Sequence, residues 1–202
     1  MFEKALVHFK KVDKVLYLVA QNSKPIRLQT SNDLFDSICR EIIGQQLSGK
    51  VADTIYKRFI ELFPHQKPTP TAISLLSADQ LRNVGMSWAK VRSLLDLTDK
   101  ITTYKLNINS LENLDNESIV LELTKIKGIG PWTAEMFLMF ALAREDVFSP
   151  GDVGLKNAIT KLYKLKEKPD ENKLLAISRK WIPYRTYASI ILWNFLDNNL
   201  QK

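Results

Sequence analysis

Apolar residues recur at helical spacing along most of the chain. Leu34, Ile38 and Ile42 repeat every four positions, and Leu94 and Leu97 begin a similar face further on. This spacing places side chains on one face of a helix, whereas half-buried strands alternate apolar and polar positions. We therefore predict an all-α fold with helices near residues 2–20, 32–47, 49–63, 78–84, 88–104, 116–126, 131–143, 152–164, 171–180 and 184–197.

Residues typical of helix starts and ends separate the predicted helices. No long linker lies between them. Ser48, Ser77 and Ser87 each precede a periodic run and can cap the first turn of a helix. Prolines between residues 64 and 70 indicate a loop. We expect one compact helical unit over residues 1–202, in which the first thirty or so residues pack against helices from the C-terminal end.

The amino-acid composition indicates the kind of binding partner and the cellular compartment. The chain has 202 residues, 45% hydrophobic, with a net charge of +7 and a pI near 9.4, which favours a polyanionic partner. Cys39 is the only cysteine, so the chain cannot form an internal disulfide or a four-cysteine cluster. The apolar run 136–143 is too short to span a bilayer. We expect a soluble cytoplasmic protein that does not bind membranes.

The most informative stretch is residues 123–136, Leu-Thr-Lys-Ile-Lys-Gly-Ile-Gly-Pro-Trp-Thr-Ala-Glu-Met. Gly128 and Gly130 permit a tight turn, and Pro131 suits the first position of a second helix. The backbone N–H groups at that helix start favour an anion such as a DNA phosphate. A plain helix–helix turn explains the glycines equally well.

A second informative segment, residues 145–151, ends in a Pro-Gly turn that delivers Asp152 to a helix start. Asp152 follows Trp132 by 152 − 132 = 20 residues. An aspartate in this setting ordinarily caps the helix. It can also serve as a catalytic carboxylate, since capping does not exclude chemistry. Asp146 is an alternative carboxylate nearby, although it precedes an apolar pair.

Together the two segments resemble the helix-hairpin-helix DNA glycosylase superfamily, in which a hairpin Leu-x-x-Ile-x-Gly-Ile-Gly-x-Trp-Thr-Ala precedes the catalytic aspartate by about twenty residues. Three further stretches, residues 42–48, 85–91 and 181–188, are similar to the 3-methyladenine DNA glycosylase II (AlkA-like) branch. The resemblance spans residues 34–196. It implies a two-lobed helical fold with the active site in the cleft between the lobes and the hairpin motif at 123–136.

Residue by residue, the resemblance implies that Asp152 is the catalytic carboxylate. The base pocket is then lined by Trp132, Met136, Val153 and Tyr184. DNA contacts are assigned to Gln45, Gln46, Lys127, Gly128, Gly130 and Thr133. Gln46 is the candidate wedge that fills the gap left by the flipped nucleotide, although an ordinary helix-end glutamine fits as well. Tyr184 has core packing as its alternative role. Lys50, Arg58, Lys90 and Arg185 are among further candidate phosphate contacts.

The chain departs from the family pattern at positions that bear on its predicted activity and cofactors. Lyase members carry a lysine where this chain has Trp132, so the amine needed for a Schiff base is missing. One cysteine cannot hold an iron–sulfur cluster, and about thirty residues before the matched region are too few for an additional N-terminal β domain. We expect no metal and no cofactor, although carbonyls of residues 125–130 can hold a monovalent cation, as they do in some relatives.

The sequence therefore predicts a monofunctional DNA glycosylase that flips and excises alkylated purines from duplex DNA in base excision repair, acting as a monomer. Asp152 would stabilise the oxocarbenium-like sugar and can also act as a general base. Two alternatives stay open. One is a glycosylase of other base specificity, and the other is a non-catalytic helix-hairpin-helix DNA-binding protein.

Overall fold

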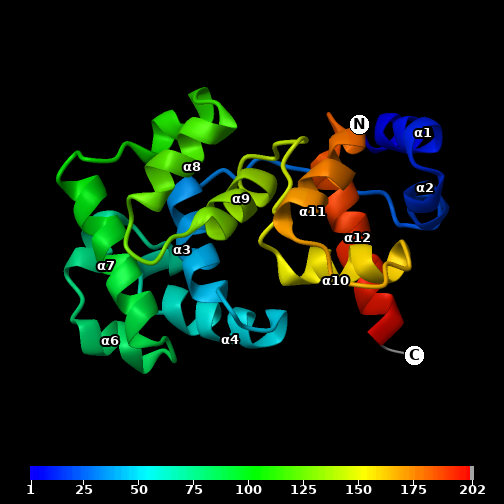
Figure 1. The fold of residues 1–202 in the computed structure, drawn as a ribbon. Coiled ribbons are helices and arrows are strands. Elements are labelled where there is room, and N and C mark those ends of the chain that lie inside the picture. The colour runs from blue at the N-terminus through cyan, green and yellow to red at the C-terminus, as the bar shows by residue number, and fades with distance from the viewer. Residues whose placement is uncertain (201–202) are drawn as a thin grey trace. The chain divides into compact units, whose positions relative to one another are not determined.

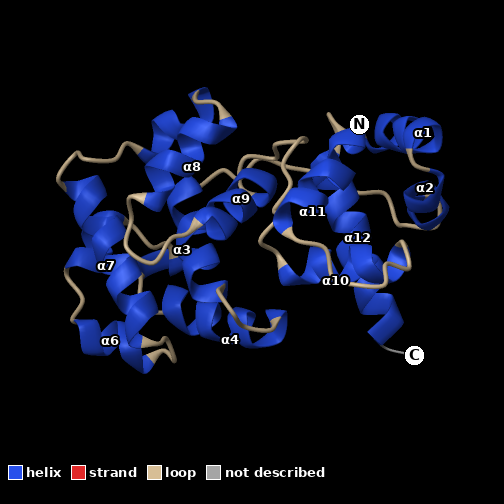
Figure 2. Cartoon of the chain, viewed as in Figure 1, coloured by secondary structure: helices blue, strands red, loops and turns tan. Residues whose placement is uncertain are grey.

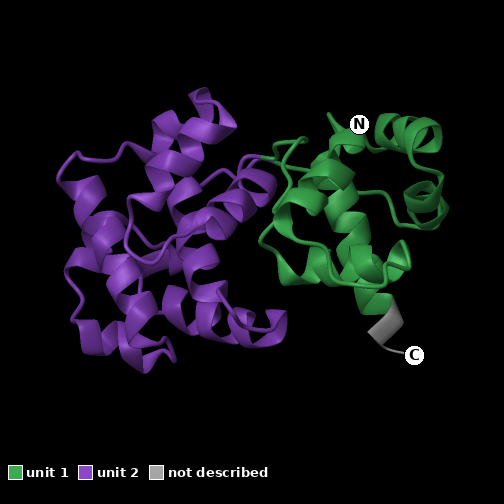
Figure 3. Ribbon diagram, viewed as in Figure 1, with its two compact units in different colours: residues 1–29, 143–202 green, residues 30–142 purple. Residues whose placement is uncertain are grey.

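The chain is built from helices joined by loops, as the computed structural model shows for residues 1–200 (Figures 1 and 2). No residue in this range lies in a strand. The prediction of an all-α fold is therefore confirmed. The helices fall into two compact units, one of residues 1–29 and 143–202 and the other of residues 30–142 (Figure 3).

The unit of residues 30–142, called unit 2, contains the hairpin segment. Its helices are α3 (Leu34–Gly44), α4 (Gly49–Ile60), α5 (Pro70–Ser74), α6 (Ala78–Asn83), α7 (Trp88–Thr102), α8 (Asn116–Thr124) and α9 (Pro131–Phe140), with 3-10 turns η1 (Pro64–Gln66) and η2 (Ile108–Asn113). Helix α3 packs against α4, α7 and α9. Its apolar face supplies Ile38, Cys39, Ile42 and Ile43, each at most 1% exposed, to the core.

The other unit, called unit 1, joins the two ends of the chain. Its elements are α1 (Phe2–Val12), α2 (Lys14–Ala20), α10 (Val153–Leu162), α11 (Glu171–Ser178), η3 (Arg179–Trp181) and α12 (Arg185–Leu200). Helix α12 packs against α2 and α10, and α1 packs against η3. The expectation that the N-terminal segment packs against C-terminal helices is thus confirmed.

A buried aspartate fastens the N-terminal helices to the C-terminal ones. Asp13 is 5% exposed and accepts hydrogen bonds from Trp181 Nε1 (2.8 Å) and from the Tyr163 hydroxyl. Lys180 Nζ lies 2.9 Å from the same carboxylate. Burial by itself raises the pKa of Asp13, but the hydrogen bonds from Tyr163, Trp181 and Lys180 outweigh it and hold the pKa below its ordinary value. The carboxylate is therefore kept charged inside the unit.

Asp13 also explains where the predicted helices differ from the observed ones. The segment 2–20, predicted as one helix, is two, because the Asp13 side chain caps the second by accepting from Leu16 N at 3.1 Å. Ser77 and Ser87 cap their helices as predicted, whereas Ser48 precedes α4 without a side-chain capping bond. The short helix α5 and the 3-10 turns were not predicted, since hydrophobic periodicity needs longer segments.

Candidate active site

The hairpin between α8 and α9 needs a glycine at residue 128. A tight turn closes between Ile126 and Ile129, whose backbone N–H donates to the Ile126 carbonyl at 3.1 Å. Gly128 has a φ of +79°, and a Cβ placed on it would lie 2.2 Å from Ser93 Oγ. Both the left-handed backbone and the close approach of Ser93 on α7 would strain a larger residue here. Gly130 has no such constraint and precedes α9 as its N-cap.

Two polar side chains hold the hairpin in place within unit 2. Gln45 Nε2 donates to the Gly128 carbonyl (3.0 Å) and to Thr133 Oγ1 (2.9 Å). Asp96 on α7 accepts from the backbone N–H of Lys127 at 2.9 Å. The Gln45 amide and the Thr133 hydroxyl are thus hydrogen-bonded within the protein. Their contact with DNA stays a prediction. A cation bound to the hairpin carbonyls also stays a prediction, and the Gly128 carbonyl already accepts a hydrogen bond from Gln45.

The start of α9 is suited to binding an anion. Gly130 provides no side-chain cap for the first turn, and Pro131 occupies the first helical position. Helix starts of this kind present backbone N–H groups and the positive end of the helix dipole. The Lys127 side chain, 79% exposed, brings a positive charge to the same hairpin, partly compensated by Asp96, whose Oδ1 lies 3.8 Å from Lys127 Nζ. A phosphate group would find both favourable charge and hydrogen-bond donors here.

Gln46 lies directly after α3 in a strained backbone conformation. Its φ is +56°, a left-handed value that costs a non-glycine residue about 1 kcal/mol or more. Its neighbour Gln45 turns inward to the hairpin, whereas Gln46 is exposed. A left-handed residue directly after a helix is also a common way for a helix to end, so the wedge and the ordinary helix-end interpretation of Gln46 both stay open.

Asp152 caps α10 in unit 1. Its Oδ1 accepts a hydrogen bond from the backbone N–H of Leu155 at 2.7 Å, and the side chain is among the buried polar groups, at 9% exposed. The same oxygen accepts a second hydrogen bond from Trp193 Nε1 on α12, at 2.9 Å. The capping role is therefore present, and the indole adds a second, directional constraint on the carboxylate.

Gly154 makes room for that indole. A Cβ on Gly154 would lie 3.0 Å from Asp152 Oδ1 and 3.1 Å from both Trp193 Cδ1 and Trp193 Nε1. These distances are tighter than most contacts of a Cβ atom, so a side chain here would require the indole or the carboxylate to shift slightly. Sequence reasoning missed both Gly154 and Trp193. Trp193 lies 41 residues after Asp152 in an apolar helix, where nothing marks it as different from a core residue.

The loop that carries Asp152 is fixed to α12 at its other end. Arg185 donates from Nε to Asp146 Oδ1 (2.7 Å) and from Nη2 to Asp146 Oδ2 (2.9 Å). The Thr186 hydroxyl accepts from the Val147 N–H at 3.1 Å and donates to the Arg144 carbonyl at 2.6 Å. Asp146, the alternative catalytic carboxylate, thus forms a bidentate ion pair with Arg185, which favours a structural role for both residues.

The remaining predicted pocket residues lie in different settings. In unit 2, Trp132 is half-buried and Met136 is 4% exposed. In unit 1, Val153 is 67% exposed at the first position of α10. Tyr184 packs edge-on against the His8 ring, with ring centres 5.5 Å apart. The core-packing role of Tyr184 is therefore observed, and contact of these four residues with a base stays a prediction.

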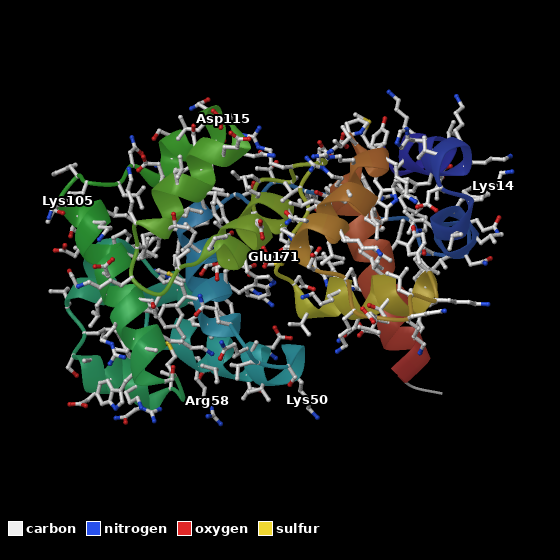
Figure 4. All side chains as sticks on the ribbon, in the orientation of Figure 1. Lys14, Lys50, Arg58, Lys105, Asp115 and Glu171 are labelled. Atoms are coloured by element: carbon white, nitrogen blue, oxygen red, sulfur yellow. The ribbon has the colours of Figure 1, made fainter. Side chains whose placement is uncertain are left out.

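Candidate phosphate contacts also divide into two groups. Lys50 and Arg58 on α4 are exposed, and their side chains extend away from the ribbon (Figure 4). Lys90 instead donates to the Ile43 carbonyl at 2.9 Å, at the end of α3, and burial lowers the pKa of its amine. Arg185 is held by Asp146. Lys90 and Arg185 thus have structural roles, while Lys50 and Arg58 are available to a polyanion.

Among the residues that the structure describes, no three histidine, cysteine, aspartate or glutamate side chains come together as a metal site would need. No helix in the same range is long and apolar enough to cross a membrane.

The sequence of this chain matches a known protein family. A family profile described as "HhH-GPD superfamily base excision DNA repair protein" matches residues 39–184, which include the hairpin and Asp152. The chain belongs to this superfamily. The resemblance seen in residues 123–136 and at Asp152 is thereby confirmed at the level of the family.

Members of the superfamily with similar sequences carry alkylation-repair names. A putative DNA-3-methyladenine glycosylase of Bacillus subtilis is 34% identical over 198 residues, covering 95% of this chain and 68% of the relative. DNA-3-methyladenine glycosylase 1 of Schizosaccharomyces pombe is 32% identical, covering 94% of this chain and 86% of the relative. A crystal structure of a Bacillus halodurans DNA-3-methyladenine glycosidase superposes with a TM-score of 0.81 at 34% identity, covering 100% and 91% of the two chains.

Solved structures with this fold include complexes with DNA. The Schizosaccharomyces pombe 3-methyladenine DNA glycosylase in complex with abasic DNA superposes with a TM-score of 0.85 at 31% identity, covering 95% of each chain. An 8-oxoguanine glycosylase/lyase from Clostridium acetobutylicum, 18% identical with a TM-score of 0.82, shares the fold alone. The two-unit helical fold is thus the superfamily fold.

Proposed function

We propose that this chain is a monofunctional DNA glycosylase that flips alkylated purines of the 3-methyladenine type out of duplex DNA and hydrolyses their N-glycosidic bonds. Asp152 is the catalytic carboxylate. The observation that carries the proposal is a buried aspartate, held by two hydrogen-bond donors on one oxygen, in a chain whose similar relatives are named 3-methyladenine glycosylases. Duplex DNA containing the lesion is the partner, and the protein acts as a monomer.

The chemistry follows from the charge that develops on the sugar. As the bond between C1′ and the base nitrogen breaks, its electron pair leaves with the base and the deoxyribose becomes oxocarbenium-like. A carboxylate near that centre stabilises the transition state more than the ground state, which accelerates the reaction. Leu155 N and Trp193 Nε1 keep Asp152 in one orientation, so little reorganisation accompanies the reaction. Water then attacks C1′, with Asp152 accepting its proton.

Contact with the DNA backbone is assigned to unit 2. The α9 start and Lys127 contact phosphate, which positions the duplex without reading its sequence. Gln46 fills the space of the flipped nucleotide. Trp132, Met136, Val153 and Tyr184 contact the base, with Trp132 offering its ring face to a cationic purine.

The absence of lyase activity follows from Trp132, which occupies the position of the lysine nucleophile. A Schiff base with the abasic sugar requires an amine, and an indole cannot supply one. Borohydride reduction during turnover should therefore trap no covalent enzyme–DNA adduct. A stoichiometric adduct would show that another amine performs the reaction and that the enzyme is bifunctional.

The test of the catalytic assignment is Asp152→Asn. Asparagine caps a helix about as well as aspartate, so folding should persist while the negative charge is lost. Loss of electrostatic stabilisation of about 2.7–4 kcal/mol should lower single-turnover base release by roughly a hundredfold to a thousandfold, with affinity for lesion DNA within several-fold of wild type.

The matched control is Asp170→Asn. Asp170 caps α11 in the same unit by accepting from Lys173 N at 2.8 Å, and it has no assigned catalytic role. It should retain full activity and a similar melting temperature to Asp152→Asn. If Asp152→Asn excises the base at the wild-type rate, the catalytic assignment is wrong. If wild type binds lesion DNA and releases no base, the chain is a binding module.

A further inference from the structure

Asp96 on α7 contacts both the backbone and the side chain of Lys127 in the hairpin. Its Oδ2 accepts hydrogen bonds from the Lys127 N–H at 2.9 Å and from Lys100 Nζ at 2.8 Å. Its Oδ1 lies 3.8 Å from Lys127 Nζ, and the side chain is only 12% exposed. One carboxylate therefore receives a backbone donor and two ammonium groups, although a helix–helix turn by itself requires none of these contacts.

The carboxylate of Asp96 stays ionised in this setting. Partial burial by itself raises its pKa, but the hydrogen bonds from Lys100 and from the Lys127 N–H, together with the charges of both lysines, hold the pKa below its ordinary value. Hydrogen bonds to an ionised acceptor are roughly twice as strong as those between neutral groups. The Lys127 backbone is thus held more firmly than that of an ordinary turn residue.

Helix α7 can approach the hairpin this closely because residue 128 is a glycine. Ser93 lies one turn before Asp96 on the same side of α7, and its Oγ is 2.2 Å from the place that a Cβ of Gly128 would occupy. Gln45, directly after α3, donates to the Gly128 carbonyl at 3.0 Å. Two successive hairpin residues are therefore fixed within the protein, one through its N–H and the other through its carbonyl.

The two lysines around Asp96 differ in how easily they can leave it. Lys100 follows Asp96 by four residues on α7, lies 2.8 Å away and is 23% exposed. Lys127 is 79% exposed, and its Nζ is 3.8 Å from the carboxylate. An exposed ion pair at such a distance contributes little to stability. The Lys127 ammonium can therefore move to another anion, while Lys100 remains to neutralise Asp96.

We propose that Asp96 is a positioning residue for DNA binding, which holds the hairpin in its binding conformation and gives up the Lys127 ammonium when a phosphate arrives. Lys100 then remains as the counter-charge, so the carboxylate repels the duplex less than an unpaired anion would. The inference rests on the proposed contact between the hairpin and DNA phosphate. If Asp96 were simply an anion near the DNA, its removal would strengthen binding, so the two interpretations differ in the sign of the effect.

The first test compares two variants of Asp96 in binding to an undamaged duplex, measured by fluorescence anisotropy. Asp96→Asn keeps an oxygen that can accept from the Lys127 N–H, whereas Asp96→Ala removes it. Asp96→Ala should bind about tenfold more weakly than wild type, the scale of one lost hydrogen bond to a charged group, and Asp96→Asn should recover most of that loss. An Asp96→Ala affinity equal to or above that of wild type, or equal losses in both variants, would overturn the proposal.

The matched control is Asp99→Ala, which removes the same charge from an exposed position of the same helix and should leave the affinity within about twofold of wild type. Hydrogen exchange of the Lys127 amide, followed by NMR, then measures the positioning without DNA. This amide should exchange at least about tenfold faster in Asp96→Ala than in wild type, while the amides of Ile38 and Ile42 in α3 keep their wild-type rates. Equal exchange at Lys127 in both proteins would contradict the positioning role.

The movement of Lys127 from Asp96 to phosphate is tested with Lys100→Met, in variants that need no Asp96→Ala protein. Without Lys100, Asp96 retains the Lys127 ammonium more strongly, so affinity for the duplex should fall by about threefold to fivefold. In an Asp96→Asn background the same substitution should change the affinity little, because the charge that retains Lys127 is gone. An equal loss in both backgrounds would show that Lys100 itself contacts DNA, which would refute the exchange.

Base release separates this role from catalysis. With enzyme in saturating excess over lesion DNA, Asp96→Ala should release the base within about twofold of the wild-type rate, while the enzyme concentration that gives half of the maximal rate rises about tenfold. A maximal rate that falls as much as the affinity would refute a role in binding alone. If wild type releases no base, the proposed activity is wrong, whereas the affinity and exchange measurements still test Asp96.

Discussion

Replacing Trp193 by phenylalanine isolates the hydrogen bond that the indole donates to the candidate catalytic carboxylate. Trp193 Nε1 lies 2.9 Å from Asp152 Oδ1, and the ring packs against the core of unit 1. Phenylalanine retains most of that packing and loses only the N–H donor and part of the ring. The bond from the Leu155 N–H to Oδ1 remains, while the carboxylate loses one of its directional constraints.

The expected magnitude follows from the charge on the acceptor. A hydrogen bond to a charged group is worth about 1.5–3 kcal/mol, and each 1.36 kcal/mol changes a rate by tenfold. If the bond serves to orient Asp152, single-turnover base release should fall by about tenfold to a hundredfold. For a chain of this length the melting temperature should fall by roughly 3–12 °C, and lesion-DNA affinity should stay within about threefold.

A double-mutant cycle with Asp152→Asn is the assay that separates orientation from general destabilisation. If Trp193 acts through Asp152, Trp193→Phe should change the rate little once the carboxylate is gone, although the melting temperature still falls. The control is Trp88→Phe, which alters a 46% exposed tryptophan in unit 2 and should leave the rate unchanged. An undiminished rate effect of Trp193→Phe in the Asp152→Asn background would refute the positioning role.

Two further predictions concern the hairpin and the buried aspartate. Gly128→Ala, strained by its φ of +79° and by Ser93 Oγ, should weaken binding to damaged and undamaged duplex alike in anisotropy titrations, whereas loss confined to lesion DNA would contradict phosphate binding. Asp13 has a pKa below its ordinary value of 3.8, so it stabilises the fold above that value and loses this contribution as the pH falls through its folded pKa. Urea unfolding should therefore show Asp13→Asn markedly less stable than wild type near neutrality, with the difference narrowing below about pH 4; a constant difference would refute this.

The features that the sequence predicts are those encoded locally. The hairpin glycines and the Pro-Gly turn before Asp152 carry their structural meaning within a few residues, because a positive φ or a helix cap is a local requirement. The all-α fold follows similarly from periodicity. The end of α1 at Val12 and the cap of α2 by Asp13 are local features as well. They were missed because the hydrophobic pattern continues across Asp13.

The features that the sequence does not predict depend on residues far apart in the chain. Gln45 meets the hairpin across 83 and 88 residues, and Trp193 meets Asp152 across 41. Asp96 looks like an ordinary helical aspartate until its hydrogen bond with the Lys127 N–H, 31 residues away, is known. Spacing rules describe neighbours on one helix, so contacts between helices require the tertiary structure.

The start of α10 differs from the other aspartate-capped helices in a way that capping alone does not explain. Asp13, Asp33, Asp115 and Asp170 each cap a helix whose second residue carries a full side chain, namely Val15, Phe35, Glu117 and Asn172. The corresponding residue after Asp152 is Gly154, where a Cβ would lie only 3.0 Å from the carboxylate and 3.1 Å from the Trp193 indole. Capping requires only the bond from Leu155 N. The glycine is needed because an indole from α12 approaches the same oxygen, which is the arrangement expected of a carboxylate whose direction matters.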